Sequence, residues 1–151
     1  MYDFRDEYKM NFFLKQHAKA FVENPNAGTM TNLLAEFVIR IEDECEALVP
    51  MVMEENRIHY DTISDGQNEW IPMYTDWDEL TKEQPTEYTM SVPIRTIVKD
   101  AFESKRAEGI ILNLHSEEVF IGKAELDWVL DVLMQRESDK ASQEMNNGRI
   151  E

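Results

Sequence analysis

Aromatic residues recur every four positions at the start of the chain. Phe4, Tyr8 and Phe12 would share one face of an α helix, and an adjoining stripe continues through Met10, Phe13, Leu14, His17 and Phe21. Asn24 precedes Pro25, and a residue before proline avoids helical backbone angles, so the helix is predicted to end there. Its apolar surface either packs on the rest of the protein or meets another subunit.

A second amphipathic helix and a group of strands follow the break at residues 26–28. Thr29 or Thr31 is predicted to cap this helix, and its buried face would consist of Leu33, Leu34, Phe37, Val38 and Ile41. Residues 47–54 are apolar and predict a strand, in which Pro50 requires an edge or a bulge. Residues 56–64 alternate, which is typical of a half-buried strand with Ile58, Tyr60 and Thr62 on one face.

Turn and cap signals divide the middle of the chain. Ser64-Asp65-Gly66 predicts a turn, and residues 69–75 would form the antiparallel partner of the preceding strand. Asp76 then caps a short helix, because Asp78 and Glu79 fall in its first turn, where the helix dipole favours negative charge. Pro85 is predicted to end this helix.

The last third of the chain predicts two further strands between two helices. After a brief strand at residues 88–91, Ser91 and Pro93 would open a helix that Gly109 ends, with a stripe of Ile94, Ile97, Val98, Ala101 and Phe102. Residues 110–114 and 119–122 read as strands. Residues 123–136 predict a last helix that buries Leu126, Val129, Leu130 and Leu133. This order of elements predicts an α+β fold with a mostly antiparallel sheet and helices packed mainly on one face.

Charge narrows the classes of partner. Of the 151 residues, 31 are acidic and 15 basic, which gives a net charge of −16. Such a surface repels nucleic acid and anionic lipid and favours a basic protein or a cation as partner, and the alternative is a solvated surface that its charge keeps soluble. The mean hydropathy of −0.52 and the absence of a long apolar run exclude a transmembrane helix. The acidic start of the chain is unlike a signal peptide, and the single Cys45 cannot form an internal disulfide, so a cytoplasmic address is predicted.

The sequence contains few candidates for chemistry. Cys45 lies among acidic neighbours that oppose a thiolate, which favours a small buried residue at a helix–strand junction. The segment DTISDG has Ile63 where a calcium loop needs an oxygen ligand, so a hairpin turn is the better interpretation. His17, His59 and His115 share no metal-binding spacing, and we therefore predict no metal, cofactor or catalytic residue.

Carboxylates and aromatic side chains gather around residues 70–79. Asp76, Asp78 and Glu79 could bind a metal or transfer protons, although capping and the helix dipole account for them structurally. Trp70, Tyr74 and Trp77 beside this acidic rim could form a contact surface, although core packing is the alternative for at least two of them. The polar connection around His115 is a further candidate, because connections between elements often carry function.

Three short segments in a fixed order resemble the N-terminal domain of the SseB family. They are Val49-Pro50 at a strand, residues 71–75 at a corner before an acidic helix start, and residues 109–113 at a strand end. Two positions depart from the family pattern, namely Asp76 in place of serine and Leu114 in place of proline. The resemblance covers residues 27–134. It implies an α+β fold in cytosolic bacterial proteins with no established catalytic residues, and structural roles for Thr75, Asp76 and Asn113.

These observations predict three parts and a function. An N-terminal aromatic helix occupies residues 1–26, an SseB-like domain residues 27–136, and a disordered acidic tail residues 137–151, which lack periodicity. The expected function is a non-enzymatic protein-interaction or regulatory domain. Its homodimer contact would involve Phe4, Tyr8 and Phe12, and its binding residues would be Trp70, Tyr74, Asp76, Trp77, Asn113 and His115.

The alternative is a small-molecule or metal-dependent enzyme. It would use the Asp76–Glu79 corner together with His59 or His115, if the fold brings them into one pocket.

Overall fold

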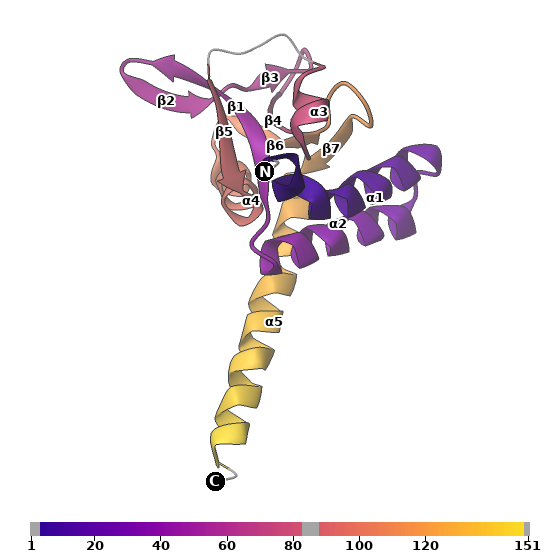
Figure 1. Ribbon diagram of the computed structural model, residues 1–151, viewed down its shortest axis with the longest axis vertical. Helices are drawn as coiled ribbons and strands as arrows, with labels where there is room; N and C mark the ends of the chain where they lie inside the picture. Colours follow the sequence, from indigo (N-terminus) through magenta and orange to yellow (C-terminus); the bar gives the residue numbers. More distant parts are fainter. Residues whose placement is uncertain (1–3, 83–87, 150–151) are drawn as a thin grey trace.

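The structure is a computed structural model, which describes residues 4–82 and 88–149 of the chain (Figure 1). Side chains are described for residues 8–82 and 88–145. The predicted helix end at Pro85 and the side chain of Phe4 lie outside these described parts.

Two mostly antiparallel sheets and five α helices make up the described fold, which confirms the α+β class. One sheet has the order β2-β1-β5 and the other the order β3-β4-β6-β7, in which only β4 and β6 run parallel. A bridge between Leu48 and Tyr74 joins the two sheets. The strands are β1 (Glu46–Glu54), β2 (Arg57–Tyr60), β3 (Ile63–Ser64), β4 (Glu69–Met73), β5 (Tyr88–Pro93), β6 (Ala107–Leu112) and β7 (Val119–Gly122).

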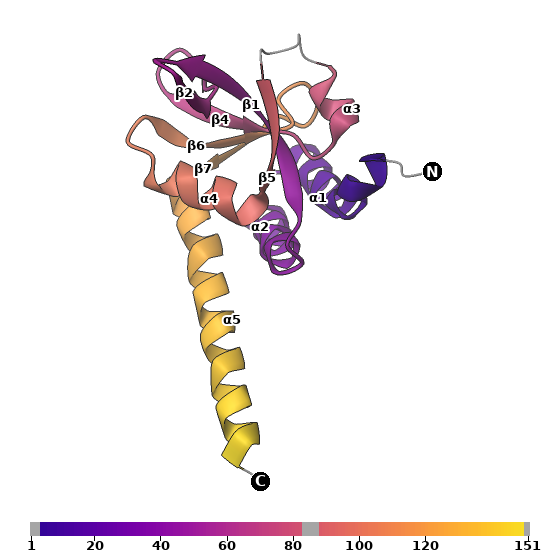
Figure 2. The same ribbon diagram turned by 60° about the vertical axis from the view of Figure 1, so that its left-hand side comes forward.

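The helices lie mostly to one side of the strands (Figures 1 and 2). A 3-10 helix, η1 (Phe4–Asn11), leads into α1 (Phe12–Glu23), which packs beside α2 (Ala27–Glu42). The short α3 (Trp77–Leu80) follows β4 along the chain, and α4 (Ile94–Glu103) packs on β6 and on α5 (Lys123–Arg149). No helix in the described residues is long and apolar enough to cross a membrane.

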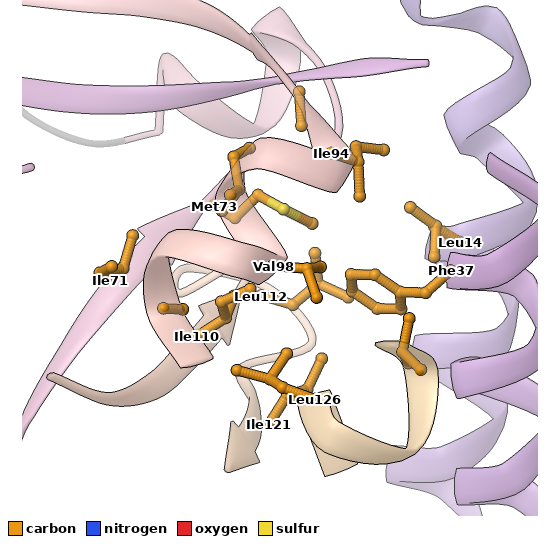
Figure 3. Close-up of a cluster of buried hydrophobic side chains, with 14 of the residues drawn as sticks. Leu14, Phe37, Ile71, Met73, Ile94, Val98, Ile110, Leu112, Ile121 and Leu126 are labelled. Carbon is orange, nitrogen blue, oxygen red and sulfur yellow. The ribbon is translucent and has the colours of Figure 1, made fainter. Parts of the chain in front are cut away.

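One hydrophobic core unites these layers (Figure 3). The predicted stripes of α2, α4 and α5 are confirmed, since Phe37, Val98 and Leu126 all lie inside it. Leu14 and Ala18 of α1 are also fully buried in the same cluster. The first helix therefore packs on the rest of the protein, which is one of the two alternatives stated for its apolar surface.

The aromatic face predicted for the first helix does not form, because residues 4–11 are a 3-10 helix. That helix has about three residues per turn, so a spacing of four rotates each side chain away from the previous one. Tyr8 is buried and its hydroxyl donates to Ser91 Oγ at 2.8 Å, whereas Phe12 is exposed. Tyr8 is therefore not exposed for the expected homodimer contact, and that contact stays a prediction.

Pro50 lies in the central strand of its sheet, and neither the predicted edge nor a bulge is present. The N–H and C=O of Leu48 bond to Tyr74, on the side of β1 away from β5. The backbone groups of Pro50, two residues later in the strand, face that side as well. There Asp61 N donates to Pro50 O at 3.0 Å, and β1 changes partner from Tyr74 to β2. The missing N–H of Pro50 falls at this change, where no strand partner needs it.

Three predicted helix ends require correction. Asn26, not Thr29 or Thr31, caps α2, and Thr29 returns the bond to Asn26 N. Ser91 does not cap α4, because Ile94 N instead donates to Cys45 O at 2.9 Å. Ser104, not Gly109, ends α4, since its Oγ accepts bonds from the N–H groups of residues 106 and 107.

The segment predicted as one half-buried strand, residues 56–64, divides between the two sheets as β2 and β3. Ile58 is 51% exposed, because β2 extends beyond the helices that cover β1. Of the four residues of β2, only Tyr60 is partly buried, and its hydroxyl donates to Asp100 Oδ2 of α4 at 2.6 Å. The predicted turn at residues 64–66 and the antiparallel pairing of Ile63 with Trp70 are confirmed.

The disordered tail expected over residues 137–151 is wrong as far as Arg149, because α5 continues to that residue. Residues 137–147 contain neither proline nor glycine, so no residue breaks the helix. Arg136 pairs with Glu42, Glu137 with Arg95, and Gln135 bonds to Asp139 one turn on. These contacts fix the point where α5 leaves the body.

Gly109 provides a test of the packing between β6 and β7. A Cβ at Gly109 would lie 2.0 Å from the backbone oxygen of Ile121. We predict that Gly109→Ala lowers the free energy of unfolding by about 3 kcal/mol or more, because no rotamer change relieves a backbone contact. Chemical denaturation monitored by circular dichroism measures this loss.

Gly122, directly opposite Gly109, provides the matched control. A Cβ there would meet only the flexible Glu125 side chain, at 3.2 Å. Gly122→Ala should therefore cost about 1 kcal/mol or less. Equal losses in the two variants would contradict the packing argument.

Candidate functional site

Four polar residues around Thr75 connect separate segments of the chain, and we call them the Thr75 cluster: Asn11, Thr75, Asp76 and Asn113. Asn113 Oδ1 accepts from Thr75 N at 3.0 Å, and Asn113 Nδ2 donates to Thr75 Oγ1 at 3.1 Å. Asn11 Nδ2 donates to Thr75 O at 3.0 Å and to Glu46 O at 2.7 Å. Asp76 Oδ2 accepts from Thr75 Oγ1, while its Oδ1 caps α3 through Glu79 N.

Asn113 can occupy this position because of its backbone conformation. Its φ of 48° lies in the left-handed region, which asparagine tolerates better than most residues. In this conformation its carbonyl accepts from the N–H groups of Ser116 and Glu118, which closes the connection between β6 and β7. The structural roles expected for Thr75, Asp76 and Asn113 agree with these contacts.

A second set of polar residues surrounds Glu79, and we call it the Glu79 cluster: Lys15, Glu79, Lys82 and Ser116. Glu79 is fully buried, and its Oε1 accepts bonds from Lys15 Nζ and, at 3.1 Å, from Lys82 Nζ. Ser116 Oγ donates to Glu79 Oε2 at 2.6 Å and lies 2.6 Å from Lys82 Nζ. The cluster joins α1, α3 and the β6–β7 connection.

Electrostatics hold the Glu79 cluster in its charged form. Burial alone would raise the pKa of Glu79, but hydrogen bonds from Lys15, Ser116 and Lys82 lower the pKa below its ordinary value. Burial alone would lower the pKa of Lys15, but the contact with Glu79 raises the pKa. The Ser116 hydroxyl donates to Glu79, and a carboxylate whose pKa is lowered is a weak base, so the contact favours a structural role for Ser116 over that of an activated nucleophile.

An open groove lies beside these two clusters, between the first helical segment and α3. It has a volume of about 710 Å³, and we call it the aromatic groove. Its exposed apolar side chains are Met10, Phe12 and Phe13, which are 45%, 55% and 45% exposed. Trp77 of α3 forms the opposite wall together with Asp76 and Asp78. The other lining residues are Tyr8, Lys9, Lys15 and Gln16.

The structure brings together only some of the predicted binding residues. Asp76 and Trp77 line the aromatic groove, whereas Tyr74 is fully buried beneath it in a small cluster with Tyr8 and Leu48. His115 is exposed and its ring stacks on Tyr74, with 6.4 Å between centroids. Asn113 is buried in the Thr75 cluster.

Trp70 lies away from the aromatic groove, at the other end of β4. Its Nε1 donates to Asp65 Oδ2 at 2.9 Å, and its ring packs edge-on against Phe120. Asp65 Oδ1 accepts from the N–H groups of Gln67 and Asn68. Asp65 therefore holds the turn through Oδ1 and the start of β4 through Oδ2.

For the catalytic alternative, the structure separates His59 from the Asp76–Glu79 corner. The strand β2, which carries His59, lies apart from α3 in both views (Figures 1 and 2). Asp76 and Glu79 direct their oxygens to the contacts described above. In the part of the chain that the structure describes, no three His, Cys, Asp or Glu residues could hold a metal ion.

Cys45 is half-buried between α2 and β1, which is more open than the buried position expected. Burial raises the pKa of the Cys45 thiol more than the neighbouring Arg40 lowers it, so the thiol is held away from the reactive thiolate.

Sequence reasoning missed Asn11 and Lys15 as parts of the site. Both lie on a segment read only for its apolar stripe, and their partners Thr75 and Glu79 are each 64 residues away. A signal existed for Lys15, because it is a basic residue within a run of aromatic positions. No local signal marks Asn11.

Comparisons of the chain with models of protein families, with curated proteins and with solved structures find no match. The resemblance to the SseB family gains no support from these comparisons. The fold, the charge and the site define an acidic α+β protein with an exposed aromatic groove.

The Thr75 cluster predicts how substitutions at Asn113 behave. Asn113→Ala removes both side-chain bonds and places alanine at a positive φ, so we expect a loss of about 3 kcal/mol in the free energy of unfolding. Asn113→Gly removes the bonds but accepts the backbone angle, and its loss should be about 1 kcal/mol smaller. Urea denaturation measures both. A glycine variant no more stable than the alanine variant would show that backbone strain contributes nothing.

The Glu79 cluster predicts a dependence of stability on pH. The folded pKa of Glu79 lies below its unfolded value, so its stabilisation is present above the unfolded pKa and is lost as pH falls through the folded pKa. Glu79→Gln should lower the free energy of unfolding near pH 7, because it leaves Lys15 without its ionised partner. The loss should be about 2–3 kcal/mol, less than for a fully buried pair, because Lys15 is partly exposed and keeps part of its hydration. Below about pH 4 the difference between variant and wild type should shrink.

Denaturant titrations from about pH 3 to pH 7 measure this convergence. Arg95→Ala is the control, because the exposed pair of Arg95 with Glu137 should contribute less than about 1 kcal/mol. A gap between Glu79→Gln and wild type that stays constant across the range would rule out ionised Glu79 as its origin.

Proposed function

We propose that this protein is a non-enzymatic interaction domain that binds a basic protein partner through the aromatic groove. One observation carries the proposal: three large apolar side chains, Met10, Phe12 and Phe13, are about half exposed beside Trp77 in one groove. Single exposed apolar residues are ordinary, but a group of them rimmed by polar residues marks a contact site. Aromatic residues and methionine are also the types enriched where proteins bind one another.

The charge of the chain supports a basic partner. The net charge of −16 attracts a cationic protein over long range and repels an anionic one. Within the groove, Asp78 is an exposed carboxylate beside Trp77. The nearby positive charge of Lys15 is balanced by its contact with Glu79. A partner segment with an apolar anchor and a flanking lysine or arginine fits these features.

The walls of the groove are held in place before any partner binds. Asn11 fixes the start of α1 to β1 and to Thr75, and Asp76 and Glu79 fix α3. A rigid surface loses less conformational entropy on binding, which leaves more of the contact energy for affinity.

The SseB resemblance and the cytoplasmic bacterial setting that it implies belong to the same proposal. Its three segments lie on β1, β4 and β6, which meet through the β4–β6 pairing and the Leu48–Tyr74 bridge. This common location supports reading them as one structural unit. The enzyme alternative has less support, because the side chains of Asp76 and Glu79 are committed to structural contacts.

A photo-crosslinking experiment tests the groove as the contact site. A benzophenone amino acid placed at Phe12 should form one main adduct with a basic protein, because this position lies within the groove. The yield should fall as salt rises from about 0.1 M to about 1 M, over which the screening length shortens to about 3 Å. Adducts are measured by mass spectrometry.

The control position is Phe120, an exposed aromatic residue on β7 that does not line the groove. It should give no such adduct. The same adduct from both positions, or none from Phe12 in lysates of the source cells, would contradict the proposal.

A further inference from the structure

The strand β5 forms an open edge of the sheet β2-β1-β5. In Figure 1 it lies on the side of β1 away from β4 and β6. Edge strands offer unpaired backbone groups to other chains, and proteins commonly protect them with charged side chains, proline or bulges. The sequence of β5, Tyr-Thr-Met-Ser-Val-Pro, carries no charge, and its proline stands only at the last position.

The directions of the backbone groups follow from the neighbouring strand. Leu48 directs its N–H and C=O to Tyr74, away from β5, so Ser91 opposite it must face outward. Thr89, two residues earlier, faces outward as well, whereas Met90 faces β1. Within the described residues no backbone hydrogen bond reaches the outward groups of Thr89 or Ser91.

An exposed apolar surface continues from this edge. Tyr88 and Met90 lie on one face of β5, and Met51 of β1, which pairs with Tyr88, lies on the same face. Met53, two residues beyond Met51, and its partner Ile58 therefore lie on this face as well. Nearer the helices this face is buried in the core, but at its outer end the side chains are 37–51% exposed. We call this surface the sheet patch: Met53, Ile58, Tyr88 and Met90.

We propose that two copies of this chain pair through their β5 strands in antiparallel orientation, with the two-fold axis at Met90. In this register Thr89 of each copy lies opposite Ser91 of the other. The outward N–H and C=O groups of both residues then form four hydrogen bonds across the junction. The two Met90 side chains face each other, and the sheet becomes continuous through both copies.

The edge itself favours a second copy over another protein. Two copies present the same uncharged strand to each other, so no like charges oppose the pairing at the edge, and a two-fold axis at Met90, the commonest symmetry of oligomers, satisfies all the outward groups. A basic segment would need carboxylates along the strand, and β5 has none. The pairing joins the two sheet patches across Met90, which removes apolar surface from water. It does not involve the aromatic groove, so it is independent of the proposed function.

Cysteine crosslinking tests the register, in protein that carries Cys45→Ser. The two positions 90 should lie about 4.5 Å apart between Cα atoms, which is within the range for a disulfide. Met90→Cys should therefore form a disulfide-linked dimer under mild oxidation. Met53→Cys is the matched control, because Met53 is equally exposed but lies on β1, the strand behind β5, and not on the edge strand itself. It should crosslink at least about tenfold more slowly.

Sedimentation equilibrium of the wild-type chain provides the second measurement. Dimerisation should strengthen as salt rises, because salt screens the repulsion between two copies of charge −16. Met90→Lys should weaken it at least about tenfold, since two like charges would face each other at the axis. The aromatic-groove variant Phe12→Ser should dimerise like wild type.

Three results would overturn the proposal. They are a monomer at all concentrations up to about 1 mM, equal crosslinking of the two cysteine variants, and dimerisation that Phe12→Ser abolishes while Met90→Lys leaves it intact. Binding of a strand from another protein to β5 in a chain that stays monomeric would also replace the second copy as its partner.

Discussion

The hydrogen bonds of Thr75 are the constraint on which the arrangement of this protein depends. Thr75 follows β4 and uses its N–H, its carbonyl and its hydroxyl for contacts with three other positions. Asn113 connects Thr75 to the end of β6, and Asn11 connects it to the start of α1. Asp76, which accepts from the Thr75 hydroxyl, also caps α3. A buried polar group without a partner costs about 1–3 kcal/mol, so these bonds are expensive to break one at a time. Segments far apart in the sequence are thereby held at one point.

This arrangement explains why a buried acidic residue can lie next to an exposed aromatic surface. The Thr75 cluster fixes the backbone of α3, so Glu79 points inward to Lys15 and Ser116 while Trp77 points to the groove. The charge of Glu79 is balanced inside the protein and does not contribute to recognition. The excess acidic charge that a partner meets comes from other residues on the surface.

Much of the fold could be predicted because its core is recorded in local periodicity. The stripes of α2, α4 and α5 repeat with the helical period, and the strand pattern of residues 110–122 is equally clear. The errors at Tyr8 and Gly109 arise where one residue pattern is compatible with two structures. Tyr8 was misread because a period of four assumes an α helix, and Gly109 because glycine also permits close approach of strands. For the site, the sequence indicated Asp76 and Trp77 but not Lys15, whose partner is known only from the folded chain.

The outer part of α5 has a mechanical consequence. From Glu137 to Arg149 the helix rises about 1.5 Å per residue, which gives a rod roughly 18 Å long beyond its last ion pairs with the body. A flexible segment of the same length would let its end wander through a broad range of distances, including contact with the surface. Here the end is held at a nearly fixed separation and direction. Any group attached to this end is therefore held at a fixed distance from the body of the protein.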